Sequence, residues 1–431
     1  MSDGERRVVI TGLGVVAPIG IGKDAFWKAL VERRSGIRQI PEFQEQGFPS
    51  TFGGRVREFD PLAYVKQRKS LKVMARDIQL AVAGAKLAAA DAGLAEAKLD
   101  PTRVGVEFGA GLICTDLDEL ALPVTASVNG CRWFDIRKWG EEGMGQLFPL
   151  WLLKYLPNML ACHVSIFHEA RGPNNTITES EAASNLAIGE AYRIICRGHA
   201  DVIIAGGADN KIHPLGMVRL GLLNQLSRRN DSPQTASRPF DAQRDGMVPG
   251  EGAGVLILEE LEHARRRGAK MYAEVVGFGA GCDGRSQGRV NRQGIGPALA
   301  MENALRDAGM NADEVGHINA HGLSGPLEDE AEARAIYRVF GPEAKRVPVT
   351  ANKSYFGNLG AGTGAVELIA SVLALEQGVI PPTLNYEQGD PECRLNVVAG
   401  DPMESQAKSF VSTSFTTAGQ SAALAVRAFA A

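Results

Sequence analysis

The chain has 431 residues, of which 45% are hydrophobic and 22% are charged, and its formal net charge is −4. This length allows two domains or one double-sized unit, and the slight negative charge gives no reason to expect nucleic acid as a partner. No apolar run is long enough to cross a bilayer, and the first residues lack the apolar region of a signal peptide. We therefore expect a cytoplasmic protein with no membrane partner. The six cysteines form no CxxC pair and the seven histidines lack metal-site spacing, which predicts reduced thiols and no metal.

Short, continuous apolar runs alternate with longer helical runs along the chain. Such runs are typical of strands buried on both faces of a sheet. The alternation of strands with long helices predicts a layered α/β fold. Strands are predicted at residues 8–10, 202–205, 255–258 and 273–276, and helices at residues 24–34, 75–93, 182–196, 296–309, 328–340 and 364–377.

Two halves are predicted, residues 1–262 and 263–431. No Pro/Ser-rich linker separates them, so we expect them to pack as one unit. The least regular stretch is an insertion at about 111–160, which contains three tryptophans and the apolar segment FPLWLLKYLPN. The segment FPLWLLKYLPN is interpreted either as an apolar cap or interface, or as an internal core helix.

The most specific string is SRPFDAQRDGMVPGEGAGVLILEELEHARRRGA, residues 237–269. Its glycines indicate a turn that feeds a buried strand, and phosphate binding is a weaker interpretation because no helix follows them directly. The string resembles the signature of the elongating β-ketoacyl-acyl-carrier-protein synthases. Further stretches match the same family in order, and the resemblance covers roughly residues 7–428. These stretches are VVITGLGVVAPIG, LPNMLACHVSIFHEARGPNNTIT, ADVIIAGGAD, NAHG with PLED, and NKSYFGN.

The resemblance implies a thiolase-type fold, in which two similar halves form a five-layered α-β-α-β-α core, and a dimer. It implies no cofactor, because the substrate is carried on the phosphopantetheine of an acyl carrier protein. The family's chemistry uses a cysteine nucleophile at a helix N-terminus, two histidines that bind the enolate oxygen, and backbone N–H groups that stabilise an oxyanion.

Glu181 stands where the resemblance places the family's cysteine, in the stretch ITESEAASNLAIGEA. A carboxylate is electrostatically stable at a helix N-terminus, and that stability makes it a poor nucleophile. Glu181 either caps the helix and fills the old pocket, or has a chemical role.

Of the two histidines in the family's motifs, this chain has the first and lacks the second. His321 matches the first family histidine, within a motif that also keeps Asp329 and Glu332. Asn358 replaces the second, and its amide can donate a hydrogen bond but cannot carry a proton. Lys353 is kept, and we expect that it could form a buried ion pair with Glu181.

Two other regions carry implied roles. In the C-terminal loop Phe415 is kept, but Thr417 replaces the gating phenylalanine next to the oxyanion donor, which argues that acyl loading is relaxed or lost. A basic run on a predicted helix is either a solvated face or a docking surface for the acidic carrier protein. Its members are Lys66, Arg68, Lys69, Lys72 and Arg76.

Three functions remain open. The first is a non-condensing subunit that resembles the chain-length factors of type II polyketide synthesis. It would work with an acyl carrier protein in a homodimer or in a heterodimer with a cysteine-bearing ketosynthase. The second is a malonyl-carrier-protein decarboxylase or other acyltransferase that uses His321 with Glu181 in place of cysteine. The third is a structural relic without chemistry. For the dimer, we expect an interface built from roughly residues 155–210.

Overall fold

The computed structural model describes residues 6–284 and 290–429, so the outermost ends of the two predicted halves lie outside the description. In the described residues, 11 strands join in one hydrogen-bonded sheet. Its order is β11-β10-β14-β15-β9-β1-β8-β7-β5-β6, and β2 pairs with β1. The first half supplies β1 (Val8–Ala17), β2 (Gly20–Ile21), β5 (Val104–Ala110), β6 (Asn174–Ile177), β7 (Val202–Asn210) and β8 (Glu251–Glu260). The second half supplies β9 (Ala273–Cys282), β10 (Ile318–Asn319), β11 (Val349–Thr350), β14 (Ser409–Phe415) and β15 (Gln420–Ala428).

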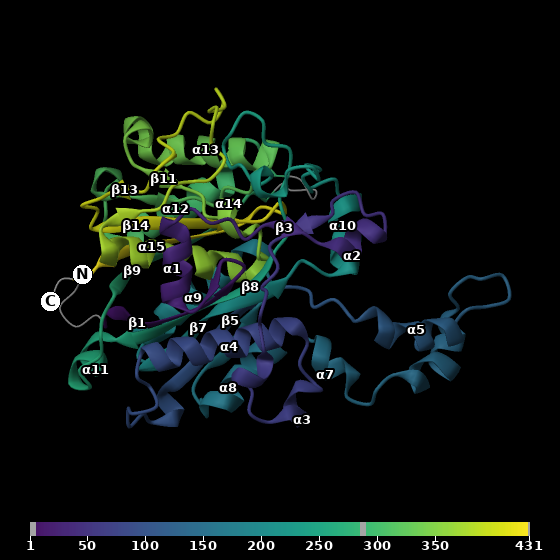
Figure 1. Ribbon diagram of the computed structural model, residues 1–431. Helices are drawn as coiled ribbons and strands as arrows, with labels where there is room; N and C mark the ends of the chain where they lie inside the picture. The colour runs from purple at the N-terminus through teal and green to yellow at the C-terminus, as the bar shows by residue number, and fades with distance from the viewer. Residues whose placement is uncertain (1–5, 285–289, 430–431) are drawn as a thin grey trace.

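The sheet bends around two central helices, α9 (Ala183–Cys196) and α15 (Thr363–Gln377), which pack on each other and contact strands of both halves. One outer face is covered by α4 (Arg76–Asp91) and α8 (Met159–His168), and the other by α12 (Ile295–Ala308) and α13 (Pro326–Phe340). Figure 1 shows these helices below, within and above the sheet. The predicted five-layered α-β-α-β-α core is therefore confirmed.

The core helices match their predicted ranges closely. Predicted helices 75–93 and 364–377 correspond to α4 and α15, and each boundary differs by no more than two residues. These helices are easy to predict because buried apolar side chains fix them: nearly all of α15 from its first residue to Ala374 is buried between the layers.

Shorter elements surround this core. The helices are α1 (Lys23–Val31), α2 (Pro41–Glu45), α3 (Arg68–Leu71), α10 (Pro214–Leu222), α11 (Leu261–Arg266) and α14 (Lys353–Phe356). Two small two-stranded sheets are also present: β3 (Arg38–Gln39) pairs with β4 (Phe52–Gly53), and β12 (Val379–Ile380) pairs with β13 (Met403–Glu404). In the part of the chain that is described, no helix combines the length and apolar character that a membrane span requires.

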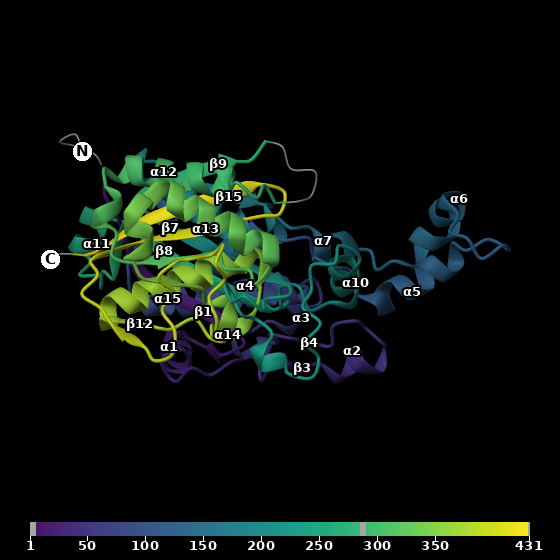
Figure 2. The same cartoon turned by 90° about the horizontal axis from the view of Figure 1, so that it is seen from above.

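The insertion predicted at about 111–160 forms an arm, defined here as residues 115–155. It contains α5 (Leu117–Ala126), α6 (Ile136–Lys138), a π-turn at Trp139–Gly143, a 3₁₀ turn at Met144–Gln146 and α7 (Trp151–Tyr155). Figures 1 and 2 show α5 and α6 standing away from the body of the molecule in both views. The interpretation of the segment FPLWLLKYLPN as an internal core helix is wrong, because Phe148 and Leu152 are 50% and 57% exposed.

Candidate functional site

A cavity of about 150 Å³ opens at the start of α9, where segments of both halves meet. It brings together four of the residues predicted from the sequence: Glu181, His321, Phe415 and Thr417. Among the described residues that line it, none is a cysteine. The remaining lining residues are Ser180, Lys211, Arg219, Leu220, Leu223, Gln225, Met247, Leu323 and Glu328.

Glu181 lies in a short 3₁₀ turn, Ser180–Ala182, that leads directly into α9. The residue before it, Ser180, has a φ of 45°, which is a strained left-handed conformation for a residue with a side chain. Gly109 of β5 allows the close approach that seats this helix, since a Cβ there would lie 2.5 Å from the Ser184 nitrogen. The backbone therefore holds Glu181 at the helix start with its side chain in the cavity.

The Glu181 carboxylate is stabilised by two partners. Its Oε1 accepts a hydrogen bond from Asn358 Nδ2 at 3.0 Å, and the ammonium of buried Lys211 lies close enough to interact with its charge. Burial alone would raise the pKa of Glu181, but Lys211 and Asn358 outweigh burial and hold it below its usual value. Glu181 is therefore an anion at neutral pH.

The predicted ion pair between Lys353 and Glu181 is wrong. Lys353 is buried and its Nζ lies 3.0 Å from Glu367 Oε1 on α15. The same ammonium donates to the backbone oxygen of His321. Glu367, one helical turn into α15, is the carboxylate nearest to Lys353. The spacing of residues along the sequence does not show this proximity, which arises from the packing of the helices. Burial raises the pKa of Glu367 to about 7, although Lys353 opposes that rise.

The His321 ring is neutral and held in one orientation. Lys353 Nζ lies 3.1 Å from Nδ1, so Nδ1 accepts and the ring proton sits on Nε2. Burial, followed by the charge of Lys353, keeps the pKa of His321 well below its ordinary value. Nε2 has no hydrogen-bond partner among the described residues, and the ring packs on Phe415 with centroids 4.5 Å apart. His321 thus has one unpaired N–H donor at the cavity.

The two carboxylates kept in the His321 motif brace its loop. Glu332 accepts from the backbone nitrogens of His321 and Gly322 at 2.6 and 2.7 Å. Asp329 accepts from the nitrogens of Ser324 and Phe240 at 3.0 and 2.8 Å. These residues position the histidine and do not line the cavity.

The polar groups of Asn358 are already engaged. Its Nδ2 donates to Glu181 and approaches Met247 Sδ at 3.2 Å. Its Oδ1 accepts from Gly360 N and from the Thr363 hydroxyl at 3.0 and 3.2 Å. The enolate donor expected from this amide is therefore directed at Glu181.

Comparison with known proteins identifies the family. The model of the beta-ketoacyl synthase N-terminal domain matches residues 5–264, and that of the C-terminal domain matches residues 272–387. The chain belongs to the β-ketoacyl synthase family.

Named relatives agree with this assignment. The chain is 40% identical to the 3-oxoacyl-[acyl-carrier-protein] synthase 2 of Vibrio harveyi, over 91% of each chain. The solved ishigamide ketosynthase/chain length factor matches with a TM-score of 0.86 and 31% identity, over 99% of this chain and 100% of that one. A chain from a complex of a type II polyketide acyl-carrier protein with its ketosynthase matches with a TM-score of 0.85 and 30% identity, over the same shares.

Lys211 is the main residue that the sequence reasoning missed in this β-ketoacyl synthase-family chain. It directly follows β7, and its Nζ lies 3.1 Å from Asp209 Oδ2. Burial lowers the pKa of Lys211, but Asp209 and then Glu181 raise it above its usual value. The available signal was a lysine immediately after an apolar strand, in ADVIIAGGADNK.

The predicted docking run divides into two parts. Lys66, Arg68, Lys69 and Lys72 are exposed on and beside α3. Arg76, however, pairs with the buried Glu251 at 2.9 Å and lies over the ring of Phe59. Arg76 is therefore a structural ion-pair partner, and the docking prediction for it is corrected.

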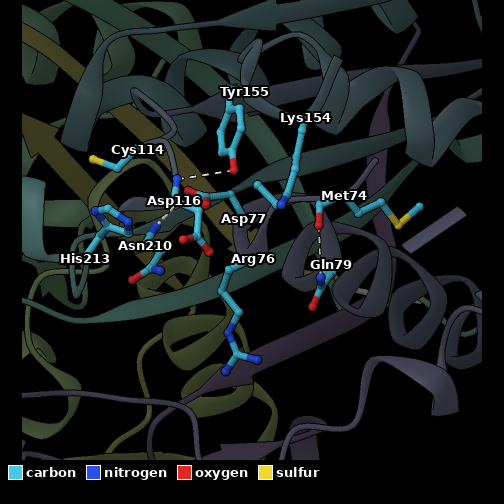
Figure 3. A pocket seen from close by; sticks show the side chains of 11 residues that line it. Met74, Arg76, Asp77, Gln79, Cys114, Asp116, Lys154, Tyr155, Asn210 and His213 are labelled. Carbon is cyan, nitrogen blue, oxygen red and sulfur yellow. Dashed lines mark hydrogen bonds between the residues drawn. The ribbon is translucent and has the colours of Figure 1, made fainter. Parts of the chain in front are cut away.

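A second cavity, of about 200 Å³, lies between the ends of the arm and α4 (Figure 3). The arm and its approach contribute Cys114, Asp116, Lys154 and Tyr155, and the lining is polar. Burial raises the pKa of the Cys114 thiol, which makes it a weak nucleophile. The other lining residues are Met74, Ala75, Arg76, Asp77, Gln79, Asn210 and His213.

Proposed function

We propose that this chain is a non-condensing subunit of fatty acid or type II polyketide synthesis that pairs with a cysteine-bearing ketosynthase and works with an acyl carrier protein. The ionised Glu181 at the start of α9 carries the proposal. Condensation requires a thiolate that accepts the acyl chain as a thioester, and the cavity supplies a carboxylate whose negative charge is stabilised by the charge of Lys211. An acyl ester of that carboxylate would be a reactive anhydride.

Two more features support a loss of condensation. Asn358 donates to Glu181, which removes the second donor for an enolate oxygen. Thr417 lines the cavity where the family's motif has a gating phenylalanine. Since both sit beside Glu181, the nucleophile, the enolate site and the gate have changed together.

A reconstituted assay tests the proposal. The purified chain, given acyl- and malonyl-carrier protein, should make no β-ketoacyl product above background. A cysteine-bearing ketosynthase should gain activity, or change its product length, when this chain is added. Product formed by the chain alone would contradict the proposal.

Assembly gives an independent check. The family resemblance predicts a dimer through roughly residues 155–210, which include α8, β6 and α9, with a large apolar interface. Light scattering of a purified sample at micromolar concentration should report two chains per particle. A stable monomer, both alone and with a ketosynthase, would count against this pairing.

One observation favours a second function, slow decarboxylation of malonyl-carrier protein. His321 Nε2 carries an unpaired N–H at the cavity, and decarboxylation needs a donor for the enolate oxygen but no cysteine. Lys211 partly offsets the charge of Glu181 that would repel malonate.

Carbon dioxide release from malonyl-carrier protein tests this second function in three proteins. Relative to wild type, release should fall in His321→Ala, which lacks the donor, and rise in Glu181→Gln, which keeps the shape without the charge. Absence of release from all three would remove the enzymatic alternative and leave the non-condensing role.

A further inference from the structure

A third cavity, of about 610 Å³, lies beside the turn that joins β1 to β2. Its volume is in the range of small-molecule binding sites. One wall is the turn itself, with the apolar residues Pro18, Ile19 and Ile21, and the other walls contribute three arginines. The cavity therefore combines an apolar wall with a cationic one. Its lining residues are Ala17, Pro18, Ile19, Gly20, Ile21, Arg34, Ser35, Gly36, Arg38, Arg57 and Glu58.

Positive charge exceeds negative charge in this lining. The guanidinium groups of Arg34, Arg38 and Arg57 face a single lining carboxylate, that of Glu58. Arg34 has a carboxylate partner outside the lining, Glu32 at 2.9 Å. Arg38 and Arg57 form no ion pair with any residue that the structure describes. Two cations of the cavity are therefore left without a bound carboxylate.

Neighbouring arginines show that this lack of partners is specific to the cavity. Arg33 and Arg55 lie in the same two chain segments but do not line it. Arg33 pairs with Asp401 at 2.8 Å, and Arg55 pairs with Glu42 at 2.9 Å. The protein thus supplies carboxylates to the arginines outside the cavity and leaves two arginines inside it available for a ligand.

The walls of the cavity are held in place. Gly36 N donates to the Tyr355 carbonyl at 2.7 Å, and a Cβ at Gly36 would lie 2.7 Å from Pro18 Cβ, so two walls are in direct contact. Arg38 belongs to β3, which pairs with β4, and its Nη1 donates to the Ile37 carbonyl at 2.7 Å. A site that is already formed loses less conformational entropy when it binds a ligand.

These charges favour one class of anion. Guanidinium groups bind phosphate and carboxylate oxygens through paired N–H donors. A phosphate monoester carries a charge of about −1.5 to −2 and has three acceptor oxygens, so it can accept from Arg38 and Arg57 together. A carboxylate has one charge and two oxygens, which match these two cations less well. The apolar wall adds affinity for a hydrocarbon group, about fourfold for each CH₂ that it buries.

We propose that this cavity binds a small organic phosphate, a phosphate monoester with a short apolar body. The phosphate lies between Arg38 and Arg57, and the apolar body packs on Pro18 and Ile19. The site is separate from the Glu181 cavity, because the two cavities share no lining residue. The proposal therefore stands independently of whether the chain condenses acyl groups.

Isothermal titration calorimetry of the purified chain with hexyl phosphate tests the proposal. Wild type should bind hexyl phosphate at least about tenfold more tightly than inorganic phosphate, which lacks the apolar body, or hexanoate, which lacks the phosphate. The double variant Arg38→Gln, Arg57→Gln should bind it about 30-fold more weakly or worse, since two charge-assisted contacts are lost. Arg55→Gln is the matched control, because Arg55 lies two residues from Arg57 but pairs outside the cavity. The control should bind like wild type.

Hydrogen exchange gives the location of the bound phosphate. Hexyl phosphate should slow amide exchange in residues 17–21 and 34–38 and leave residues 115–155 unchanged. The double variant should melt at the wild-type temperature, since neither arginine has an ion pair to lose among the described residues, so its weaker binding would report the lost ligand contacts.

Three results would overturn the proposal. They are equal affinity of the double variant and wild type, no saturable binding of hexyl phosphate to wild type at millimolar concentrations, and exchange that slows only outside residues 17–21 and 34–38. Equal affinity of wild type for hexyl phosphate and inorganic phosphate would also contradict it, because the apolar wall would then make no contact with the ligand.

Discussion

At the scale of single residues, the charges of Glu181 and Lys211 each offset the cost of burying the other. A carboxylate in this cavity would be destabilised by burial, and a buried lysine would be destabilised in the same way. Together, with Asp209 at 3.1 Å from Lys211, they form a buried network of alternating charge. Removing one member of such a network leaves the remaining members as buried charges without a counter-charge.

Lys211→Met should therefore be strongly destabilising. It leaves both Glu181 and Asp209 without their cation, and breaking a buried pair typically costs about 3–5 kcal/mol. Adding Glu181→Gln removes one of the two stranded charges, so the double variant should recover part of the loss. Urea unfolding gives these free energies, with Arg346→Met as control, since Arg346 is in an exposed pair with Glu343 worth about 1 kcal/mol or less. Equal stability of Lys211→Met and wild type would refute the network.

Asp77 gives a pH-dependent prediction. Burial, then repulsion by Asp209, raises the pKa of Asp77 from 3.8 to about 8. The folded state therefore binds this proton more tightly than the unfolded state, and the stability it contributes is present below pH 4 and lost as pH rises to about 8. The loss is at most about 1.4 kcal/mol per pH unit.

Asp77→Asn should remove that pH dependence. Asparagine keeps an oxygen that can accept from Asn210 N, as Asp77 does at 3.0 Å, but it does not ionise. The variant should gain stability relative to wild type progressively between pH 5 and 8 in thermal melts. A difference that stays constant over this pH range would show that Asp77 does not titrate as described.

The sequence predicted the members of the cavity better than their partners. Glu181, His321, Phe415 and Thr417 were found because each sits in a motif whose order along the chain is preserved. The Lys353 pairing was wrong and Lys211 was missed, because ion pairing depends on which charged groups the layers bring within a few ångströms. That distance is a property of the packed helices and strands, and it is not visible in the spacing along the chain.

At the scale of elements, prediction succeeded where burial is regular. The long helices of the core alternate with apolar strands, and each carries a repeating apolar pattern. The arm has no such pattern. Its short helices are interrupted by a π-turn and a 3₁₀ turn, and its apolar side chains face outward. An apolar segment such as FPLWLLKYLPN predicts burial but does not say whether its own chain or another covers it.

The exposed basic side chains on and beside α3 are predicted to bind the acidic acyl carrier protein. Lys66, Arg68 and Lys69 are exposed, and they form no ion pair with the residues that the structure describes, so reversing their charges should leave stability nearly unchanged. We expect Lys66→Glu with Lys69→Glu to lower the affinity for acyl carrier protein about tenfold or more at low salt, with a smaller effect at high salt. Fluorescence anisotropy with labelled carrier protein measures this affinity.

Arg76→Met provides the contrast for the docking variants. It removes the partner of buried Glu251, so it should lower the melting temperature while leaving carrier-protein affinity unchanged in the protein that remains folded. If the α3 charge reversals bind as tightly as wild type at low salt, this run is only a solvated face.

At the scale of the whole molecule, the cavity lies where the two central helices begin. Glu181 lies in the 3₁₀ turn that leads into α9, and Asn358, which donates to Glu181, lies before the 3₁₀ turn that leads into α15. The first half supplies Glu181 at the nucleophile position, and the second supplies His321 and Thr417 to the cavity and Asn358 as the hydrogen-bond donor to Glu181. Condensation therefore needs matching groups from both halves, and a change in one half leaves the other unsuited to the reaction.

Restoring the thiol alone should separate nucleophile reactivity from condensation. In Glu181→Cys the new thiol would sit near Lys211 at a helix start, and both the ammonium and the helix dipole favour a thiolate. Alkylation by iodoacetamide should therefore be rapid. Condensation should remain below about a hundredth of that of an intact ketosynthase, because Asn358 and Thr417 still replace the second histidine and the gate, and the loss of one oxyanion donor alone costs about 100-fold or more.

Adding Asn358→His to Glu181→Cys should raise condensation further, since the imidazole supplies a donor no longer tied to a carboxylate. Thr417→Phe should add to the rate mainly with long acyl chains, because a gate acts on loading and not on carbon dioxide loss. Rates of β-ketoacyl product formation in the single, double and triple variants measure each contribution, and alkylation shows that the thiol is accessible in all three. Full activity in Glu181→Cys alone would show that the second half still holds a complete condensing site, so that loss of the thiol would be the only barrier to condensation.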